Sequence, residues 1–401
     1  MTAPTNASRE PVYFCYPNPK GFSGQKAATL LVMNGLAERG WTCRDLPQPV
    51  LDRTVGRMRA TVGYGAALLA GWLPAVAMLF RRKSRLCVNL GQTRSAFVRD
   101  AVPLLLGRIG LGRSRVIISL HGSLFMHWRP DELNAWIFRF LLRQAERVTV
   151  LGERQRRHLV AMGIPEDRVA VVVNSCEFEP VSHQLLEEKV GCARPVDSVV
   201  HCLYLSSLID TKGFPEYLEA LRGLAGRPGP SIDAVLCGRL VESEFSDRFN
   251  DQVAAENWIV GLIDEINRQP RVRVRWIRGA VGAEKVALFQ RADLFVLPTR
   301  YAVEAQPLVL LEAMASGCAI VTTDAGEIST ILDEQSAVFL REPTAQCLAA
   351  TIQLLAGDAA ARAQLATAAH SRFVNSYQAE RHLDEWETIL ATPAPLVLAR
   401  T

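Results

Sequence analysis

Residues 294–323 read LFVLPTRYAVEAQPLVLLEAMASGCAIVTT, and this stretch decides the fold. The apolar runs 294–298 and 319–323 are typical of buried strands, and the residues between them have the composition of a helix. Pro307 is well placed at the first position of that helix, and Gly317 is typical of the residue that follows a helix C-terminus. Two buried strands joined by a helix indicate a parallel sheet covered on both faces.

Short apolar runs with helical patterns between them recur along the whole chain, in two series. The first series is 12–16, 86–90, 116–120, 148–151 and 169–173, and the second is 201–206, 233–238, 272–277, 294–298 and 319–323. Each series predicts one doubly wound α/β domain, and a length of 401 residues suits two such domains with a cleft between them. We place these domains at residues 1–192 and 193–367. The last segment, 368–401, is expected to form a helix that crosses back onto the first domain.

The composition is that of a globular protein, with 49% hydrophobic and 21% charged residues. The nine cysteines show no CxxC or other metal-binding spacing and are expected to be reduced thiols of a cytosolic protein. The first residues contain no apolar run of the kind that a secretion signal needs, so we expect a cytoplasmic location.

Charge is distributed unevenly between the two halves. Residues 1–200 hold 27 Lys and Arg against 16 Asp and Glu, and the remainder holds 18 against 25. A basic first half suits a phosphorylated acceptor or an anionic membrane surface, such as the inner face of the cell membrane. The basic residues are interleaved with apolar runs, and no nucleic-acid-binding motif is present, so we expect no nucleic-acid partner.

Residues 60–80 form an uncharged stretch as long as a membrane span. Three glycines and one proline interrupt it, and a span would put the strand at 12–16 and those at 86–120 on opposite sides of the bilayer. We therefore expect no span. Two alternatives stay open: a buried helix, or a helix that lies in the membrane plane with Tyr64 and Trp72 at the interface.

Two glutamates frame the predicted helix that starts at Pro307. The N–H groups of Leu308 and Val309 at its N-terminus can bind a phosphate, with Glu304 just before the helix and Glu312 inside it. Two carboxylates so placed can bind opposite ends of an elongated ligand that carries a diphosphate. Alternatively, both are ordinary solvated acids, but LVLLEAMASG is so apolar that an unpaired Glu312 would be costly there.

Glu304 and Glu312, with seven residues between them and AMASG and TTDAGEI (322–328) after them, resemble the E-x7-E signature of retaining GT-B glycosyltransferases of family 4. The resemblance implies two Rossmann-like domains that face a central cleft and a nucleotide-diphosphate sugar as donor. It implies that Glu304 faces the hydroxyls of the donor sugar, and that Glu312 binds the ribose.

Other segments match the family more loosely. YLSSLIDTKG (204–213) is similar to the loop that carries an Arg and a Lys for the diphosphate: Lys212 matches the lysine, but Ser207 stands in place of the arginine. SLHGSLF (119–125) resembles the family's His-Gly strand end, which implies that His121 contacts the donor sugar or shapes the acceptor pocket. In PNPKGFSGQ (17–25), Gly24 would let backbone N–H groups approach the phosphate. In RGAV (278–281), Gly279 and Val281 would lie beside the nucleotide base.

No Asp-x-Asp motif appears, so we expect no metal and no other cofactor. The resemblance implies retention of anomeric configuration, with a departing phosphate that helps to deprotonate the acceptor hydroxyl. We expect the acceptor to be a saccharide that is linked through phosphate to a membrane lipid, as in surface polysaccharide or glycolipid assembly. Two rivals stay open: a sugar-nucleotide 2-epimerase, and a non-catalytic partner subunit that has lost donor binding, which the serine at position 207 would favour.

Overall fold

The computed structural model describes residues 10–19, 23–50, 57–80, 83–191, 199–249 and 251–391. They form two compact units, Met1–Ser175 with Ala379–Thr401, and Cys176–Gln378. Residues 176–191 and 368–378 therefore belong to the second unit, whereas the sequence-based boundaries assigned them to the first domain and to the final segment. The expected boundary between residues 192 and 193 lies outside the described residues.

The first unit is built on a parallel sheet of six strands in the order β2-β1-β3-β4-β5-β6. The strands are β1 (Val12–Asn18), β2 (Cys43–Pro49), β3 (Arg85–Asn89), β4 (Val116–Ser119), β5 (Arg147–Val150) and β6 (Val169–Val171). The helices are α1 (Gly24–Glu38), α2 (Arg57–Val76), α3 (Arg94–Gly110), α4 (Leu133–Leu142), α5 (Glu153–Ala161) and α14 (Ala379–Ala391). This architecture is a doubly wound α/β domain.

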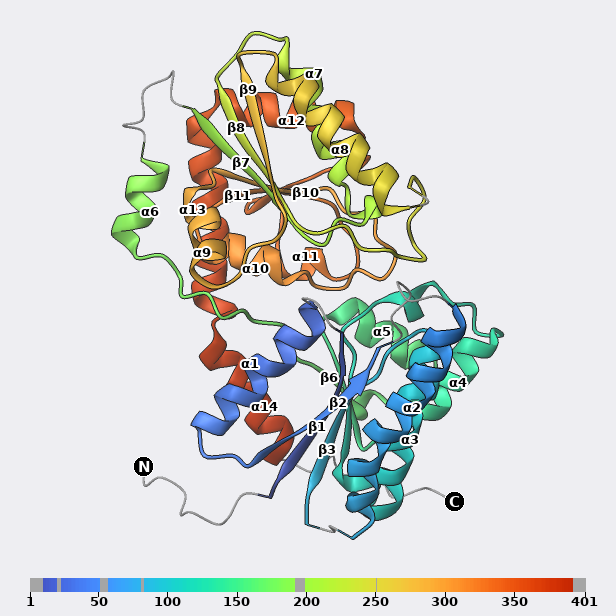
Figure 1. The fold of residues 1–401 in the computed structure, drawn as a ribbon. Helices are drawn as coiled ribbons and strands as arrows, with labels where there is room; N and C mark the ends of the chain where they lie inside the picture. The colour runs from blue at the N-terminus through green and yellow to red at the C-terminus, as the bar shows by residue number, and fades with distance from the viewer. Residues whose placement is uncertain are drawn as a thin grey trace, which may run out of the picture. The chain divides into compact units, whose positions relative to one another are not determined.

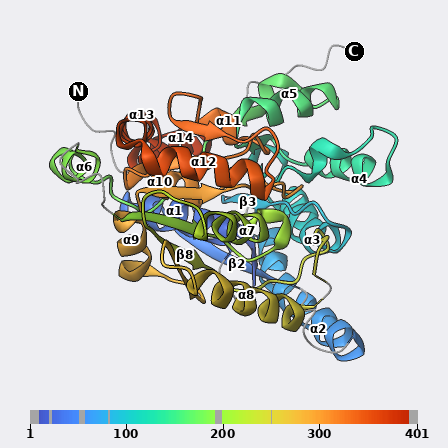
Figure 2. The same cartoon turned by 90° about the horizontal axis from the view of Figure 1, so that it is seen from above.

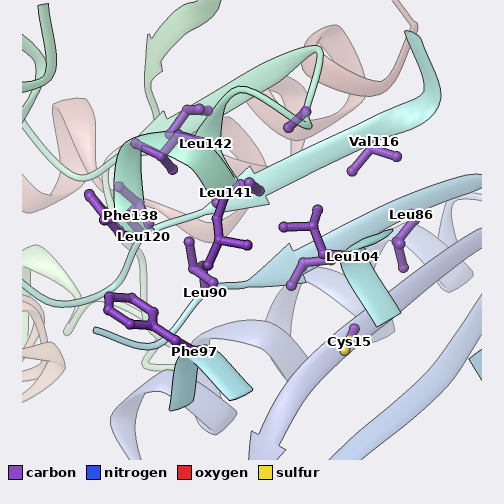
Figure 3. Packing of buried hydrophobic residues seen from close by; sticks show 14 of the residues in the cluster. Cys15, Leu86, Leu90, Phe97, Leu104, Val116, Leu120, Phe138, Leu141 and Leu142 are labelled. Atoms are coloured by element: carbon purple, nitrogen blue, oxygen red, sulfur yellow. The ribbon is translucent and has the colours of Figure 1, made fainter. Parts of the chain in front are cut away.

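Helices cover both faces of this sheet. Helices α1 and α14 pack on one face, and α2, α3 and α4 lie on the other (Figure 1). Each face has its own apolar cluster, which excludes water from the buried strands. The cluster on the α3 and α4 side is shown in Figure 3, where the labelled side chains are Cys15, Leu86, Leu90, Phe97, Leu104, Val116, Leu120, Phe138, Leu141 and Leu142.

Helix α14, the last described element of the chain, contributes directly to the core of the first unit. Trp386 packs edge-to-face on Phe14 of β1, with 6.4 Å between the ring centroids. Helix α14 also lies very close to α1, because a Cβ added at Gly35 would be 2.4 Å from Cδ1 of Leu383. A larger residue at position 35 would require the Leu383 side chain to move.

The second unit is also built on a six-stranded parallel sheet, in the order β12-β11-β10-β7-β8-β9. Its strands are β7 (Val200–Leu205), β8 (Ile232–Cys237), β9 (Val272–Ile277), β10 (Leu294–Leu297), β11 (Ala319–Thr322) and β12 (Ala337–Phe339). Its helices are α6 (His183–Val190), α7 (Phe214–Ala225), α8 (Gln252–Asn267), α9 (Gly282–Arg291), α10 (Leu308–Ala315), α11 (Ile328–Ile331), α12 (Ala345–Gly357) and α13 (Ala359–Ser376). Helices α7, α8 and α12 lie on one side of the sheet, and α9, α10 and α13 lie on the other (Figure 1).

The strand order of the second unit reverses between β7 and β10. These strands are neighbours, but one crossover runs from β7 toward β8 and the other from β10 toward β11. In open parallel sheets, ligands bind outside the carboxyl ends of the strands at such a reversal. The segments that follow β7 and β10 are therefore the natural place to look for a site.

Residues 60–80 form most of α2 and a short 3₁₀ segment, Ala77–Phe80. Among the described residues, no helix combines the length and the apolar character that a membrane crossing requires. The helix is not fully buried: among the residues of this stretch whose side chains the structure describes, Leu68 and Ala75 belong to the core, and Leu69 and Leu73 are exposed. Trp72 is half-buried, and its Nε1 donates to the Arg99 carbonyl of α3 at 3.0 Å. The helix in the membrane plane stays a prediction.

Candidate active site

The segment after β7 presents Lys212 at the point where the strand order reverses. The Tyr204 hydroxyl donates to the Lys212 carbonyl at 3.2 Å, which fixes the loop to the sheet. Gly213 has φ +88°, and a Cβ at that position would lie 2.5 Å from the Pro298 carbonyl oxygen. Because only glycine fits there, the loop packs directly on the end of β10. Ser207 is half-buried in the same loop.

Lys212 forms an ion pair with Glu304, the first glutamate of the E-x7-E pattern. Its Nζ lies 3.0 Å from Glu304 Oε2, and both side chains are largely buried. The same ammonium group lies 4.9 Å from the centroid of the Tyr301 ring. Glu304 is therefore not a solvated loop acid, and the structure brings together two predicted site residues that are 92 positions apart in the sequence.

Glu312, the second glutamate, is also paired with a lysine. Its Oε1 accepts a hydrogen bond from Nζ of Lys285 in α9, and both residues are buried, with 5% and 7% exposure respectively. Burial raises the pKa of the Glu312 carboxyl above its ordinary value, and the Lys285 ammonium partly offsets this rise. The other carboxylate oxygen, Oε2, is buried and has no hydrogen-bond partner among the described residues. Glu312 is therefore not a solvated helix residue.

Helix α10 begins at Leu308, with Pro307 as its N-cap rather than its first residue. It ends at Ala315, and Gly317 follows with φ +62°. The N–H groups of Leu308 and Val309 belong to the first turn, where they have no partner within the helix. Because of these free N–H groups, this end of α10 carries a positive partial charge that suits a phosphate. Glu304 lies four residues before it in the sequence.

A buried carboxylate anchors the loop between β8 and α8 next to Lys212. Asp210 Oδ2 accepts from the backbone N–H groups of Asp247, Arg248 and Phe249, at 3.1, 2.7 and 3.2 Å. Arg300, which follows β10, also pairs with Asp247. Sequence reasoning missed this anchor, because an aspartate 37 to 39 positions away from its partners leaves no local pattern.

Gly279 and Val281 follow β9, which is two strands away from β7 in the sheet. Gly279 has φ +103°, and its N–H donates to the Ile277 carbonyl at 2.8 Å. Val281 is exposed and caps α9. Both residues therefore stand at the same carboxyl edge as Lys212, on the side from which Lys285 reaches Glu312.

His121 lies in the first unit, immediately after β4. Its Nε2 is 3.2 Å from Ser119 Oγ, which also accepts from the Thr149 hydroxyl at 3.0 Å. Burial, together with the neighbouring His382, lowers the pKa of His121 to about 4, so the ring is neutral at pH 7. The carbonyl of Gly122 accepts from the side-chain amides of Gln92 and Gln155, which holds the His-Gly turn in place.

A small pocket lies beside His121 inside the first unit. It is lined by Thr29, Asn89, Ser119, His121, Thr149, Asn174 and His382, together with Phe14, Ala28, Val32, Cys87, Leu151, Val172 and Trp386. Nδ1 of His382 and Nε1 of Trp386 are buried without hydrogen-bond partners among the described residues. Unpaired polar atoms around a small space are the conditions under which a protein holds an internal water molecule. Sequence reasoning did not place His382 here.

Gly24 is the first residue of α1, after the N-cap Ser23. The Ser23 side chain accepts from the Lys26 N–H at 3.4 Å, and a Cβ at Gly24 would meet nothing within 4 Å. Gly24 is therefore not required for close packing within its own unit. The preceding glycine, Gly21, lies outside the described residues. Within the part of the chain that the structure describes, no three His, Cys, Asp or Glu side chains are grouped as metal ligands would be.

Two parallel-sheet units with these loops define the GT-B class of glycosyltransferases. The model of the family "Glycosyl transferases group 1" matches residues 199–372, and that of "Glycosyltransferase Family 4" matches residues 27–178. The two matches together span most of the chain. The chain belongs to the family 4 type of GT-B glycosyltransferases, which confirms the resemblance and the fold class inferred from the sequence.

Solved structures of the same fold cover nearly the whole chain. Sucrose-phosphate synthase from Thermosynechococcus elongatus has a TM-score of 0.69 and 17% identity, with 96% of this chain and 98% of that chain covered. Anabaena HepE, in complex with UDP and glucose, has a TM-score of 0.62 and 15% identity, with 94% and 99% covered. A glycosyltransferase from Rickettsia africae has a TM-score of 0.63 and 15% identity, with 94% and 97% covered. No curated protein sequence matches the chain.

Proposed function

We propose that this glycosyltransferase moves a sugar from a nucleotide-diphosphate sugar to a hydroxyl group of a saccharide acceptor, with retention of anomeric configuration. One observation carries the proposal: both glutamates of the E-x7-E pattern are buried and each is paired with a lysine, on either side of the α10 N-terminus. Burial of a carboxylate costs desolvation free energy, and proteins retain such a group where a ligand uses it. The complexes of HepE with UDP and with UDP-glucose support a donor of this kind.

We assign roles from charge and position. Lys212 and the N–H groups of Leu308 and Val309 bind the diphosphate, because an ammonium group and a helix N-terminus both stabilise negative charge. Glu304 accepts from hydroxyls of the donor sugar, and Glu312 accepts from those of the ribose. In the first unit, His121 contacts a sugar as a neutral ring, and Gly24 leaves the first turn of α1 open to a phosphate oxygen.

The leaving diphosphate gains charge as the glycosidic bond breaks, and Lys212 and α10 offset this charge without a metal. The departing phosphate then accepts the acceptor's proton on the face from which it leaves, which retains the configuration. Transfer should therefore continue in excess EDTA, and NMR of the product should show the donor's anomeric configuration. Inversion at the anomeric carbon would overturn the stereochemical part of the proposal.

Nucleotide diphosphates and their sugars are expected to raise the melting temperature of the protein, because a ligand that binds only the native state stabilises it by mass action. Glu312→Ala should remove most of the shift. Differential scanning fluorimetry with UDP, GDP and ADP and their sugars checks this and identifies the base. Absence of any shift would favour the non-catalytic partner subunit. Product formation without an acceptor would instead favour the 2-epimerase.

The acceptor side of the proposal rests on exposed apolar stripes of the first unit. Leu69, Leu73, Val76 and Phe80 are spaced by four, three and four residues on one side of α2 and its extension, and Phe80 is 83% exposed. Leu133, Trp136 and Phe140 form a second exposed stripe on α4, where the two aromatic rings stack with centroids 6.2 Å apart. Helix α3 lies between α2 and α4 (Figure 2).

Exposed cations accompany these stripes, including Lys83, Arg94 and Arg143. An apolar helix face with basic neighbours is the composition that binds at an anionic membrane surface. We therefore propose that the first unit docks on such a surface, on the cytoplasmic side of the membrane, and that the acceptor saccharide is linked to a lipid there, as in surface polysaccharide or glycolipid assembly.

The protein should sediment with vesicles that contain anionic phospholipid, and less so at high salt because salt screens the charges. Leu69→Gln/Leu73→Gln should weaken this binding by roughly 10-fold or more, given about 25 cal/mol per Å² of apolar surface buried. Leu354→Gln is the matched control, since Leu354 is 65% exposed in the second unit and Leu69 is 64% exposed. Equal binding by both variants would contradict the docking surface.

A further inference from the structure

Lys285 is an unusual residue for its position. It is the fourth residue of α9, where the partial positive charge of the helix N-terminus disfavours a cation. It is also buried, with its Nζ on Glu312 and 5.6 Å from the centroid of the Phe178 ring. A buried lysine loses most of its hydration, and its pairing with a carboxylate rarely improves stability over an apolar pair of the same size. Packing alone therefore does not account for Lys285.

The pair leaves Glu312 in a defined state. Lys285 occupies Oε1 and holds the side chain from the α9 side, and Oε2 remains buried without a partner among the described residues. Burial by itself favours the protonated acid, and the ammonium group favours the carboxylate. One oxygen is thus fixed, and the other is an acceptor without a donor in the part of the chain that the structure describes, which is the arrangement that a ligand hydroxyl would complete.

We propose that Lys285 is a positioning residue that presents Glu312 as an ionised, singly occupied acceptor for the ribose hydroxyls of the donor nucleotide, and that it thereby sets the selectivity for a ribonucleotide over a deoxynucleotide. The proposal rests on the proposed donor binding. Sequence reasoning missed Lys285, although one signal was available: in AEKVALFQ (283–290), the lysine stands four residues before the buried Phe289, on the apolar side of the helix.

Isothermal titration calorimetry with UDP, GDP and ADP, each compared with its 2′,3′-dideoxy analogue, tests the proposal. The wild type should bind the preferred ribonucleotide about 10- to 100-fold more tightly, the range for a hydrogen bond to a charged acceptor. Lys285→Met should reduce that ratio to near 1. Its affinity for the dideoxy analogue should stay within about 2-fold of the wild-type affinity, because the variant loses the hydrogen bond from the ribose to Glu312 and keeps the contacts with the diphosphate.

The matched control is Lys189→Met. Lys189 also reaches α9 and α10, but its Nζ donates to the carbonyls of Phe289 and Ser316 near the C-terminal ends of these helices, at 3.1 and 2.7 Å. This variant should keep the wild-type selectivity. The double variant Lys285→Met/Glu312→Gln should be no less selective than Lys285→Met alone, since both changes remove the same acceptor.

If Lys285→Met does not fold, Lys285→Gln tests the proposal instead. The glutamine amide can still donate a hydrogen bond to Glu312, but it carries no charge. In this variant, selectivity for the ribonucleotide should be low at acid pH and recover as the pH rises and Glu312 ionises, whereas the wild type should vary less. Selectivity that is unchanged in Lys285→Met and Lys285→Gln would overturn the role of Lys285 alone. A wild type that binds no nucleoside diphosphate would overturn the proposed function as well.

Discussion

Replacement of Lys212 by alanine is expected to lower the rate of sugar transfer by about 10²- to 10³-fold, the loss seen when one preorganised group that stabilises transition-state charge is removed. Lys212 is the cation that the segment after β7 brings to the reversal of strand order, and Ser207 does not supply a second one in that loop. The diphosphate would then lose this cation and depend on backbone N–H groups at helix N-termini. The substitution also removes the lysine from its ion pair with the buried Glu304, and the carboxylate that remains repels a phosphate.

Steady-state rates with purified variants measure this effect. The fall should appear mainly in kcat, because charge on the leaving group is greatest in the transition state. Lys212→Arg should retain more activity than Lys212→Ala, since it keeps the charge but changes its geometry. Lys189→Ala serves as a control for loss of a lysine from the same unit. A fall of less than about 5-fold in Lys212→Ala would be too small for a group with this role.

Acidification should destabilise the first unit through two buried histidines. Burial is the main cause that lowers the pKa of both His121 and His382 from 6.5 to about 4. Each ring is therefore neutral in the folded unit at pH values where the unfolded chain already binds a proton. The stability that this contributes is fully present above pH 6.5 and is lost as the pH falls toward 4. A shift of this size corresponds to about 3 kcal/mol for each ring.

Urea unfolding at pH 7 and at pH 4.5 measures the loss. His382→Gln should be less stable than the wild type at pH 7 but should lose less stability between the two pH values. His183→Gln is the control, because the His183 side chain is 85% exposed and belongs to the second unit. The unfolding transition of the first unit should be measured separately, since a protein of two units need not unfold in one step. Equal losses in the wild type and in His382→Gln would contradict the assignment.

Most strands could be predicted from the sequence, because a strand buried on both faces is a continuous apolar run. The two missed strands lie at sheet edges. Strand β2 reads CRDLPQP, and its two prolines are tolerated because an edge strand has one side without a ladder. Strand β12 has three residues and forms an edge of the second sheet, beside β11. Edge strands need few apolar residues, so their sequences carry a weak signal.

The candidate site could be predicted where it depends on spacing along the chain. Glu304 and Glu312 lie on one loop and helix, so their pattern is local. Their lysine partners are not: Lys212 precedes Glu304 by 92 positions, and Lys285 precedes Glu312 by 27. Family resemblance supplied Lys212, but nothing in the sequence alone joined Lys285 to Glu312, since that contact depends on how α9 and α10 pack. Nothing in the structure explains why a serine stands at position 207 in place of the family's arginine.

The return of α14 to the first unit has a consequence for biosynthesis. The face of the sheet that carries Phe14 is completed by Leu383, Trp386, Ile389 and Leu390, which are translated after the entire second unit. The second unit is thus an insertion that can fold on the ribosome while its host waits for its final helix. A nascent or truncated chain that stops before Ala379 would expose this apolar face. Such chains should be the species that chaperones hold and proteases remove.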